Sequence, residues 1–449
     1  MLSLQQFVMN VPRPVYHRPK EERVNILTLG CDKNTVDSEQ LAAQLQANGY
    51  QVEMDAPVAR PITIVNTCGF INDSKMQSIE TLLDCISEKQ KGNIRLLLVF
   101  GCLSQRYRDE LRTEMPEVDA WFGVNALADI LACLHAEVQP ALLTRRTLST
   151  PSHYAYLKIS EGCNHGCAFC AIPLIRGRHV SRPMESLLEE ARLLAERGVK
   201  ELILVAQDLS SYGIDLYQKR ELAQLLEKRA GIPQLQWIRL HYAYPNHFPM
   251  EVLEVIREHP QICHYLDIPI QHIDNELLHS MKRNITGDEI RRLLDGIRTR
   301  IPDIALRTSL IVGYPGETAK KFKRLLDFVE ETRFDRLGVF TYSHEENTPA
   351  YQLKDRVSQN EKERRKEELM WLQEEISLQK NKAKIGQEMK VLIDTQTATH
   401  YIGRSQYDSP DVDNTVRLNR KNNHCRTGEF YRVKITRAES FDLTGHVLS

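Results

Sequence analysis

The amino-acid sequence predicts an α/β protein built from three parts. Strand-like and helix-like segments alternate within two separate stretches, 23–140 and 149–380, which is typical of parallel sheets covered by helices. From 382 to 449 the pattern changes to strand-like runs separated by Asp, Asn, Gly and Pro. A chain of 449 residues is also too long for one ordinary hydrophobic core. We expect residues 1–22 to form a short, loosely ordered lead-in.

Three strand-and-helix units make up the first part. The expected strands are Arg23–Leu29, Ile62–Val65 and Ile94–Phe100, and the expected helices are Asp37–Asn48, Ser74–Glu88 and Ser104–Met115. Leu41 and Leu45 lie one helical turn apart on the same face of the first helix. Because a helix follows each strand, we expect the strands to run parallel in a Rossmann-like domain over 23–140.

Six strand-and-helix units make up the second part. The expected strands are Tyr154–Ser160, Glu201–Ala206, Trp237–Leu240, Tyr265–Ile268, Leu306–Val312 and Arg336–Thr341. Helical patterns between them include Pro183–Arg197, Glu221–Arg229, Glu289–Thr299 and Thr318–Thr332. Six units are too few for the standard eight-unit TIM barrel, so we expect a partial (β/α)6 TIM-type barrel with its chemistry at the carboxyl ends of the strands. The charged stretch Ser358–Lys384 has a thin apolar stripe, which predicts a mostly solvated helix against the barrel rather than a coiled-coil partner.

The third part, 382–449, contains the strand-like runs Met389–Ile393 and Tyr431–Ile435. Runs of this length separated by turn residues predict a small β-barrel. From 386 onward the chain has nine Lys and Arg against eight Asp and Glu. An RNA-binding barrel is usually more basic.

Composition excludes several classes of protein. The chain is 42% hydrophobic and 27% charged, with a net charge of −1, so it lacks the basic surplus that is typical of nucleic-acid binders. No apolar run reaches the roughly 18 residues of a membrane span, and the N-terminus does not resemble a secretory signal. Ten cysteines without a secretory route indicate a reducing cytoplasm, where thiols bind metal or stay free.

The most informative motif places three cysteines within eight residues, directly after the strand-like run Tyr154–Ser160. They are Cys163, Cys167 and Cys170. A Cys-x3-Cys-x2-Cys loop can wrap one 4Fe–4S cluster, because soft thiolates suit iron. Three ligands would leave the fourth iron open to a cofactor or substrate, as in a catalytic metal site. Structural zinc is the main alternative, with His165 as a conceivable fourth ligand, although no second close pair of ligands is present.

Three further cysteines each follow a strand of the first part beside a glycine. They are Cys31, Cys68 and Cys102. Because the carboxyl ends of parallel strands meet at one edge of a sheet, where ligands bind in open α/β folds, we expect the three thiols to converge. Glycine also permits the backbone to approach closely. A second cluster with three protein ligands is the resulting hypothesis, and three buried cysteines on loops are the alternative.

The first motif resembles that of the radical S-adenosylmethionine superfamily. With the three earlier cysteines and a terminal β-barrel, the chain from about residue 23 to 449 resembles the methylthiotransferases, whose barrel is of the TRAM type. Leu29–Asn34 and Val36–Glu39 look like the branch that modifies an aspartate in ribosomal small-subunit protein twelve, whereas the tRNA branch tends to carry Gln-Met-Asn after the first cysteine. Arg404–Asp413 also resembles the ribosomal-protein branch, with Ser409 and Asp411 in place of the commoner Ala and Glu.

The resemblance implies an enzyme that adds a methylthio group to the β-carbon of that aspartate. It implies two 4Fe–4S clusters and S-adenosyl-L-methionine as cofactors, and an electron donor and a sulfur source as partners beside ribosomal protein twelve. Both clusters are expected to face a common cavity. Clusters and cofactor carry the reaction, so no side chain is assigned a catalytic role. A tRNA adenosine 2-methylthiotransferase, and a non-catalytic iron–sulfur electron carrier or scaffold, are the alternatives.

Polar groups and glycines at the barrel strand ends are candidates for contacts to S-adenosylmethionine. We select Gln207, Arg307 and Gly313, although polar strand ends and turn glycines are common for structural reasons. His241, Tyr242, Tyr244 and His272 are further residues that line the pocket or cap the barrel. The remaining cysteines, Cys85, Cys133, Cys263 and Cys425, are expected outside both ligand sets.

Overall fold

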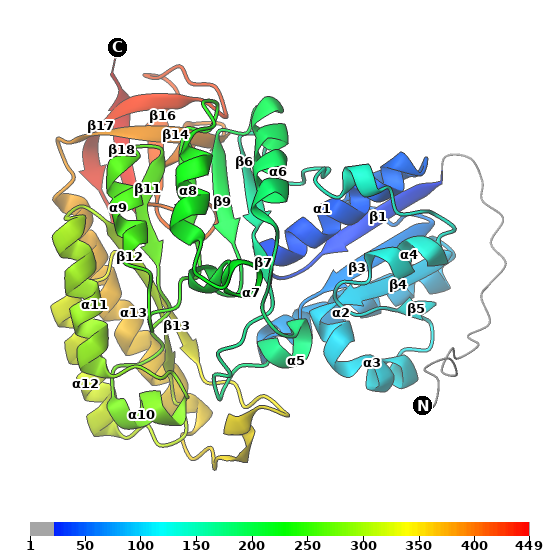
Figure 1. Cartoon of the computed structure of the whole chain (residues 1–449), viewed down its shortest axis with the longest axis horizontal. Coiled ribbons are helices and arrows are strands. Elements are labelled where there is room, and N and C mark those ends of the chain that lie inside the picture. The colour runs from blue at the N-terminus through cyan, green and yellow to red at the C-terminus, as the bar shows by residue number, and fades with distance from the viewer. Residues whose placement is uncertain (1–21, 449) are drawn as a thin grey trace. The chain divides into compact units, whose positions relative to one another are not determined.

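The structure is a computed structural model that describes residues 22–448. Apart from its last position, the lead-in predicted over 1–22 lies outside the described residues. The chain divides into two compact units, one made of the chain up to Gly69 with Asp73–Thr147, and one made of Phe70–Asn72 with the chain from Leu148 onward. Figure 1 shows a sheet with helices in each unit and a small β-barrel in the second. The predicted α/β class and the C-terminal barrel are confirmed.

The first unit contains a parallel sheet of five strands in the order β2-β1-β3-β4-β5. The strands are β1 (Arg23–Thr28), β2 (Gln51–Met54), β3 (Ile62–Thr67), β4 (Leu96–Gly101) and β5 (Ala120–Trp121). The helices are α1 (Asp32–Ala47), α2 (Asn72–Gln90), α3 (Cys102–Glu114) and α4 (Leu127–Cys133).

Strands β3 and β4 are buried along their whole length, as central strands are when helices cover both faces of a parallel sheet. Their side chains alternate between the two faces. Ile64 packs with Leu41 in one apolar cluster, and Val65 packs with Leu82 in the other. Burial on both faces explains why these strands are continuous apolar runs in the sequence.

Apolar patterns in the sequence did not predict β2, β5 or α4, and they predicted the start of α1 too late. β2 is partly exposed and alternates Gln51 and Glu53 with apolar residues, and β5 has only two residues, so neither forms a visible apolar run. α1 begins at Asp32, five residues before the predicted start, because its first turn is polar. Apolar periodicity cannot detect a helical turn that carries no apolar residue.

The second unit contains a parallel sheet of six strands in the order β13-β12-β11-β10-β9-β6. The strands are β6 (Tyr154–Lys158), β9 (Glu201–Val205), β10 (Trp237–Leu240), β11 (Ile262–Asp267), β12 (Ala305–Val312) and β13 (Arg336–Thr341). All six were predicted, with bounds that differ by at most three residues. The sheet has two free edges, β6 and β13, so it does not close into a barrel.

Helices cover this sheet and share its apolar core. The long ones are α6 (Met184–Glu196), α8 (Leu222–Ala230), α9 (Glu251–Glu258), α11 (Gly287–Arg300), α12 (Ala319–Thr332) and α13 (Gln359–Lys382). The shorter elements are the hairpin β7 (Ser160–Glu161) and β8 (Val180–Ser181), and the helices α5 (Ile172–Arg176), α7 (Ile214–Tyr217) and α10 (Asn275–Ser280). Leu369 and Ile376 of α13 lie in the core, which confirms a charged helix leaning on the sheet by one stripe. Within 22–448, none of the helices combines the length and apolar character needed to cross a membrane.

Five strands close the C-terminal β-barrel, in the order β14-β15-β16-β18-β17 with β17 pairing back to β14. They are β14 (Glu388–Gln396), β15 (His400–Ser405), β16 (Thr415–Asn419), β17 (Phe430–Ala438) and β18 (Asp442–Val447). Val391, Val416 and Val433 are fully buried inside it. Closure leaves no exposed strand edge.

Buried ion pairs join this barrel to the amino ends of the sheet strands, and Figure 1 shows the barrel at that end of the second unit. Glu201, the first residue of β9, is fully buried and pairs with Arg239 of β10 at 2.7 Å and with Arg404 of β15. Arg404 also pairs with Asp394 of β14 at 2.9 Å. Since these charges are removed from water, each depends on its partners for stability.

Replacing Glu201 with Gln removes the negative charge that Arg239 and Arg404 share. We expect the free energy of unfolding of the second unit to fall by about 3–5 kcal/mol, because the change leaves buried positive charge uncompensated. Urea unfolding followed by tryptophan fluorescence measures it, since Trp237 is buried at this junction. Glu276→Gln is the control: this carboxylate pairs with Lys321 but is 81% exposed, so little change is expected. Equal losses in the two variants would contradict the assignment.

Candidate functional site

The loop between β7 and α5 carries the three cysteines of the predicted motif, at the carboxyl end of β6. They are Cys163, Cys167 and Cys170. The loop turns back on itself, with the Cys170 amide donating to the Cys167 carbonyl at 3.0 Å. Ala168 fastens it to two other segments, because its N–H donates to the Met281 carbonyl at 2.9 Å and its carbonyl accepts from the Ala350 N–H at 2.8 Å. The position of the thiols is therefore set by parts of the chain that are distant in sequence.

The three thiols are close enough to interact electrostatically. Burial raises the pKa of the Cys163 thiol to about 11, and Asp208 and Cys167 add to the increase. Burial raises the pKa of the Cys170 thiol to about 12, and Cys167 and Cys163 add to it. Without a metal, these two thiols hold their protons at neutral pH, and binding of iron would release them.

The donor set suits a cluster better than a single metal ion. No three His, Cys, Asp or Glu side chains within 22–448 converge on a point where one ion could bind. A zinc ion needs its ligands at about 2–2.3 Å, whereas a 4Fe–4S cluster takes one cysteine per iron and spreads its ligands over a larger object. Cys167 is buried and Cys163 and Cys170 are half-buried, and three thiols in one loop match in kind and number three irons of such a cluster.

His165, the conceivable zinc ligand, has partners within the protein. Its Nε2 lies 2.7 Å from Oδ2 of Asp208, and its ring stacks on Tyr244 with centroids 3.5 Å apart and planes 5° apart. Burial acts to raise the pKa of Asp208, but hydrogen bonds from His165, Ser210 and Ser211 lower it below its ordinary value. Asp208 and Tyr244 follow β9 and β10, so the strand ends orient the histidine ring inside the cysteine loop.

Arg283 also contacts the cysteine loop, and the sequence analysis missed it. Its Nη1 donates to Sγ of Cys167 at 3.4 Å across 116 residues of chain. Arg283 lies in the turn between α10 and α11 and is 4% exposed. No local pattern marks this arginine, because the contact exists only after α10 has packed against the loop.

The strand order of the first unit places the other three cysteines at one sheet edge. Cys31 occupies the N-cap position of α1 after β1, Cys68 follows β3, and Cys102 is the first residue of α3 after β4. β1 and β3 are neighbours although β2 lies between them in the sequence, so the strand order reverses between them. Open α/β sheets bind their ligands outside the carboxyl ends of strands at such a switch point.

Close packing brings Cys68 against the loop of Cys31. Gly30 has a φ of +93°, in the region that favours glycine, and a Cβ at this position would lie 2.8 Å from Sγ of Cys68. Cys68 and Cys102 are buried, and Cys31 is half-buried. A side chain at position 30 would therefore displace one of the three thiols.

Asn34, in the first turn of α1, ties the three strand ends together. It is fully buried, and its Nδ2 donates to the carbonyls of Leu29 at 2.7 Å and Thr67 at 3.2 Å. Its Oδ1 lies 3.8 Å from Sγ of Cys102, which donates to it. In the sequence, Asn34 is marked only by the resemblance to the ribosomal-protein branch and by its position three residues after Cys31.

Gln207, a predicted cofactor contact, follows β9 beside the cysteine loop. Its Nε2 donates to Oε1 of Glu161 at 2.9 Å. Burial acts to raise the pKa of Glu161, but Lys158 and Arg176 lower it to about 2. The Oε1 of Gln207 is buried and has no hydrogen-bond partner among the described residues. This oxygen is an acceptor that a bound ligand can satisfy.

Arg307 and Gly313, the other two predicted cofactor contacts, have close protein neighbours. The guanidinium of Arg307 lies 3.1 Å from Asp267 and 3.5 Å from Asp413. Gly313 has a φ of +75°, and a Cβ there would lie 2.2 Å from Cγ of Lys362. Packing of the lysine stem accounts for glycine at this position without any ligand.

The other polar residues at the strand ends differ in their surroundings. His241 Nε2 lies 2.8 Å from Oγ of Ser409, so the C-terminal barrel holds this histidine. Tyr242 is half-buried, with a φ of 65°. His272 is fully buried and accepts the N–H of Asp274 at 3.0 Å through Nδ1. His241 and His272 therefore have structural partners.

The four remaining cysteines pack among apolar side chains. They are Cys85, Cys133, Cys263 and Cys425. Cys85 and Cys263 are buried, and Cys133 and Cys425 are half-buried. Apolar packing accounts for these four cysteines without any ligand.

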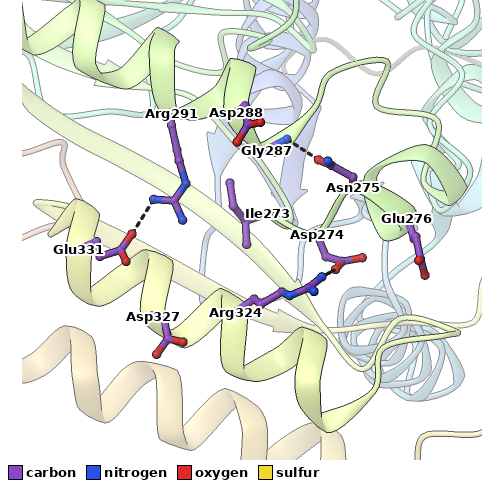
Figure 2. Close-up of a pocket in the computed structure, with 10 residues that line it drawn as sticks. All are labelled: Ile273, Asp274, Asn275, Glu276, Gly287, Asp288, Arg291, Arg324, Asp327 and Glu331. Carbon is purple, nitrogen blue, oxygen red and sulfur yellow. Dashed lines mark hydrogen bonds and ion pairs between the residues drawn. The ribbon is translucent and has the colours of Figure 1, made fainter.

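A separate pocket of about 530 Å³ lies between α11, α12 and the start of α10 (Figure 2). Five acidic residues and two arginines line it. Some of these pair with each other, as Figure 2 shows: Arg291 with Glu331 at 2.6 Å, and Arg324 with Asp274 at 2.7 Å. None of the predicted ligands or cofactor contacts lines this pocket, so we do not connect it with the cysteine loop.

Three parts of the chain each match a known protein family. Residues 23–123 match the family described as Uncharacterized protein family UPF0004, residues 157–329 match the Radical SAM superfamily, and residues 385–448 match the TRAM domain. A radical SAM domain implies a 4Fe–4S cluster and S-adenosylmethionine. The UPF0004 match is consistent with a second cluster.

The chain is similar over almost its whole length to proteins named ribosomal protein uS12 methylthiotransferase RimO. It is 50% identical over 432 residues to one from Christiangramia forsetii, covering 96% of this chain and 95% of the relative. It is 50% identical to one from Chloroherpeton thalassium, with 96% and 99% covered, and 47% identical to one from Bacteroides fragilis, with 96% and 100% covered.

Two solved structures share the fold. The radical S-adenosylmethionine methyltransferase TsrM from Kitasatospora setae has a TM-score of 0.54 at 15% identity, covering 71% of this chain and 73% of that one. The cobalamin-dependent S-adenosylmethionine radical enzyme OxsB has a TM-score of 0.52 at 14% identity, with 74% and 55% covered. At these identities the likeness concerns the fold alone.

Replacing Asn34 with Ala leaves the buried carbonyls of Leu29 and Thr67 without their donor. We expect the free energy of unfolding of the first unit to fall by about 1–3 kcal/mol in metal-free protein, the cost of unsatisfied buried polar groups. Urea unfolding reported by the fluorescence of Trp121, which is buried in this unit, measures the loss. Asn48→Ala removes three bonds, one to the Gln44 carbonyl and two with the backbone of Glu137, at the more exposed C-terminal end of the same helix, and should cost less because water can replace them. A larger loss in Asn48→Ala would contradict the role of Asn34.

Proposed function

Because the chain belongs to the RimO family of ribosomal protein uS12 methylthiotransferases, we propose that it attaches a methylthio group to the β-carbon of an aspartate in ribosomal protein uS12. Identity of 50% across 96% of the chain is the observation that carries the proposal. The target C–H bond is hardly acidic, so no general base could remove its hydrogen at neutral pH. Modification of such a carbon requires a radical that removes the hydrogen as an atom.

The first proposed ligand set is the loop of Cys163, Cys167 and Cys170. Its three thiols are neighbours, and the loop is fixed through Ala168. The 4Fe–4S cluster and S-adenosylmethionine would supply the radical when bound. The contact between His165 and Asp208 holds the loop to the end of β9.

The second proposed ligand set is Cys31, Cys68 and Cys102. Support comes from their shared position at the switch point of the first sheet and from Asn34, which links their loops by hydrogen bonds. Two of the three lie at helix N-termini, where the helix dipole favours a thiolate over a thiol. This set would hold the cluster that delivers sulfur.

Gln207, Arg307 and Gly313 remain the proposed contacts to S-adenosylmethionine. Gln207 has the strongest support, since its buried Oε1 lacks a donor among the described residues and would accept a hydrogen bond from the cofactor's ammonium group. Arg307 already pairs with Asp267 and Asp413, so it would have to contact the cofactor while keeping these two ion pairs. Gly313 would act through its backbone alone.

The proposed partners are uS12, free or within the ribosome, together with an electron donor and a sulfur source. The proposed location is the cytoplasm, where thiols stay reduced. The charge balance of the C-terminal barrel disfavours tRNA as the substrate, because it carries nine Lys and Arg against eight Asp and Glu, whereas most nucleic-acid-binding barrels are more basic.

Iron content tests the two ligand sets. Reconstituted protein should hold about eight iron atoms per chain, and Cys163→Ala and Cys68→Ala should each hold about four, because each removes one ligand of a different cluster. Cys425→Ala, which alters a half-buried thiol outside both sets, should keep the full amount. Unchanged iron in Cys68→Ala would restrict the chain to one cluster.

Mass spectrometry tests the substrate. Reduced protein with sulfide and S-adenosylmethionine should add one methylthio group to an aspartate-containing peptide of uS12 when ribosomes are supplied, and none to tRNA supplied separately. Cys163→Ala should abolish both cofactor cleavage and product. Modification of tRNA alone would replace uS12 as the substrate, and cofactor cleavage that persists in Cys163→Ala would overturn the mechanism.

A further inference from the structure

We infer that Arg283 is a positioning residue that sets the reduction potential of a cluster held by Cys163, Cys167 and Cys170, through its hydrogen bond to Cys167. The inference rests on the proposed function, because it requires a cluster on these thiols. It goes beyond that function by naming a residue outside the ligand sets that governs electron uptake.

The guanidinium of Arg283 is held in place on several sides. Nη1 donates to Sγ of Cys167 at 3.4 Å, and Nη2 donates to the carbonyl of Pro269. Its Cζ lies 4.2 Å from the centroid of the Tyr244 ring, the same ring that stacks on His165. At 4% exposure, its charge is little screened by salt.

The backbone around Arg283 is equally constrained. Its N–H donates to the Leu278 carbonyl at 2.9 Å, and its carbonyl accepts from the Tyr244 hydroxyl at 3.0 Å. Lys282 and Asn284, on either side, have φ values of 55° and 53°, so the turn adopts a conformation with little freedom to relax. The carbonyl of Met281, just before this turn, accepts a hydrogen bond from the Ala168 N–H of the cysteine loop. The arginine and the thiols are therefore held at a set distance.

A buried cation that donates a hydrogen bond to a ligating sulfur stabilises the more negative, reduced form of an iron–sulfur cluster. The hydrogen bond places the positive charge of Arg283 against Sγ of Cys167, one of the three proposed ligands. The opposing charge nearby is the buried carboxylate of Asp208, which is already paired with His165. Arg283 is thus the cation that makes reduction of this centre easier.

A redox titration followed by electron paramagnetic resonance tests the inference. The full chain carrying Cys31→Ala, Cys68→Ala and Cys102→Ala isolates the signal of the remaining cluster. In this background Arg283→Gln should lower the ratio of reduced to oxidised cluster at a given potential at least tenfold, a shift of about 59 mV for a one-electron couple. Arg283→Lys, which keeps the charge but loses the forked donor, should fall between Arg283→Gln and the parent.

Lys282→Gln is the matched control, because it removes one positive charge from the adjacent exposed residue and should leave the ratio within about twofold, as screened surface charges do. Iron content and the urea midpoint are measured in parallel, since a purely structural role would change these and leave the potential unaltered. If Arg283→Gln fails to retain iron, the potential of Arg283→Lys is compared with that of the parent instead, and a shift in the same direction is expected.

The outcomes separate the inference from the proposed function. A background protein that binds no cluster would overturn the proposed function and the inference with it. A bound cluster whose potential is the same in the parent, Arg283→Gln and Arg283→Lys would overturn the inference alone. An equal shift in Lys282→Gln would also overturn it, because the effect would then be one of net charge rather than of the hydrogen bond.

Discussion

Parallel strands carry whatever follows them to one edge of their sheet, and the proposed chemistry of this chain depends on that constraint. In the first unit it brings Cys31, Cys68 and Cys102 to neighbouring strand ends. In the second unit it surrounds the Cys163 loop with residues that follow other strands, such as Asp208. The sheet is held by its apolar core, so the strand ends are free to carry polar and reactive groups that would be costly inside it.

Burial of charge is the second organising feature. At the cysteine loop, burial raises the pKa of the Cys163 and Cys170 thiols and shields the guanidinium of Arg283, beside Cys167, from solvent. At the opposite end of the strands it locks the C-terminal barrel to the sheet through Glu201 and Arg404. The loop after β15 continues this contact, with Asp408 pairing with Arg336 and Asp413 with Arg307. The barrel is therefore part of the folded second unit in addition to any role in substrate binding.

Sequence patterns predicted most of the regular structure, and the exceptions have physical causes. All six strands of the second unit follow from apolar runs because both of their faces are covered. β2 and β5 escaped prediction because an exposed edge strand and a two-residue strand have no such run. The first turn of α1 was not predicted because its residues are polar, and one of them, Asn34, contacts the cysteine loops instead of an apolar core.

The sequence by itself determined the cysteine spacing, the place of each cysteine after a strand, and the resemblance that identifies the family, because these depend on local order along the chain. Only the tertiary structure decided which side chains surround the thiols. Arg283 reaches Cys167 across 116 residues and Asn34 reaches Cys102 across 68, and neither pair leaves a periodic signal. Likewise, packing between elements leaves Oε1 of Gln207 buried without a donor among the described residues and places Arg307 beside two carboxylates. Periodicity along one segment does not encode such packing.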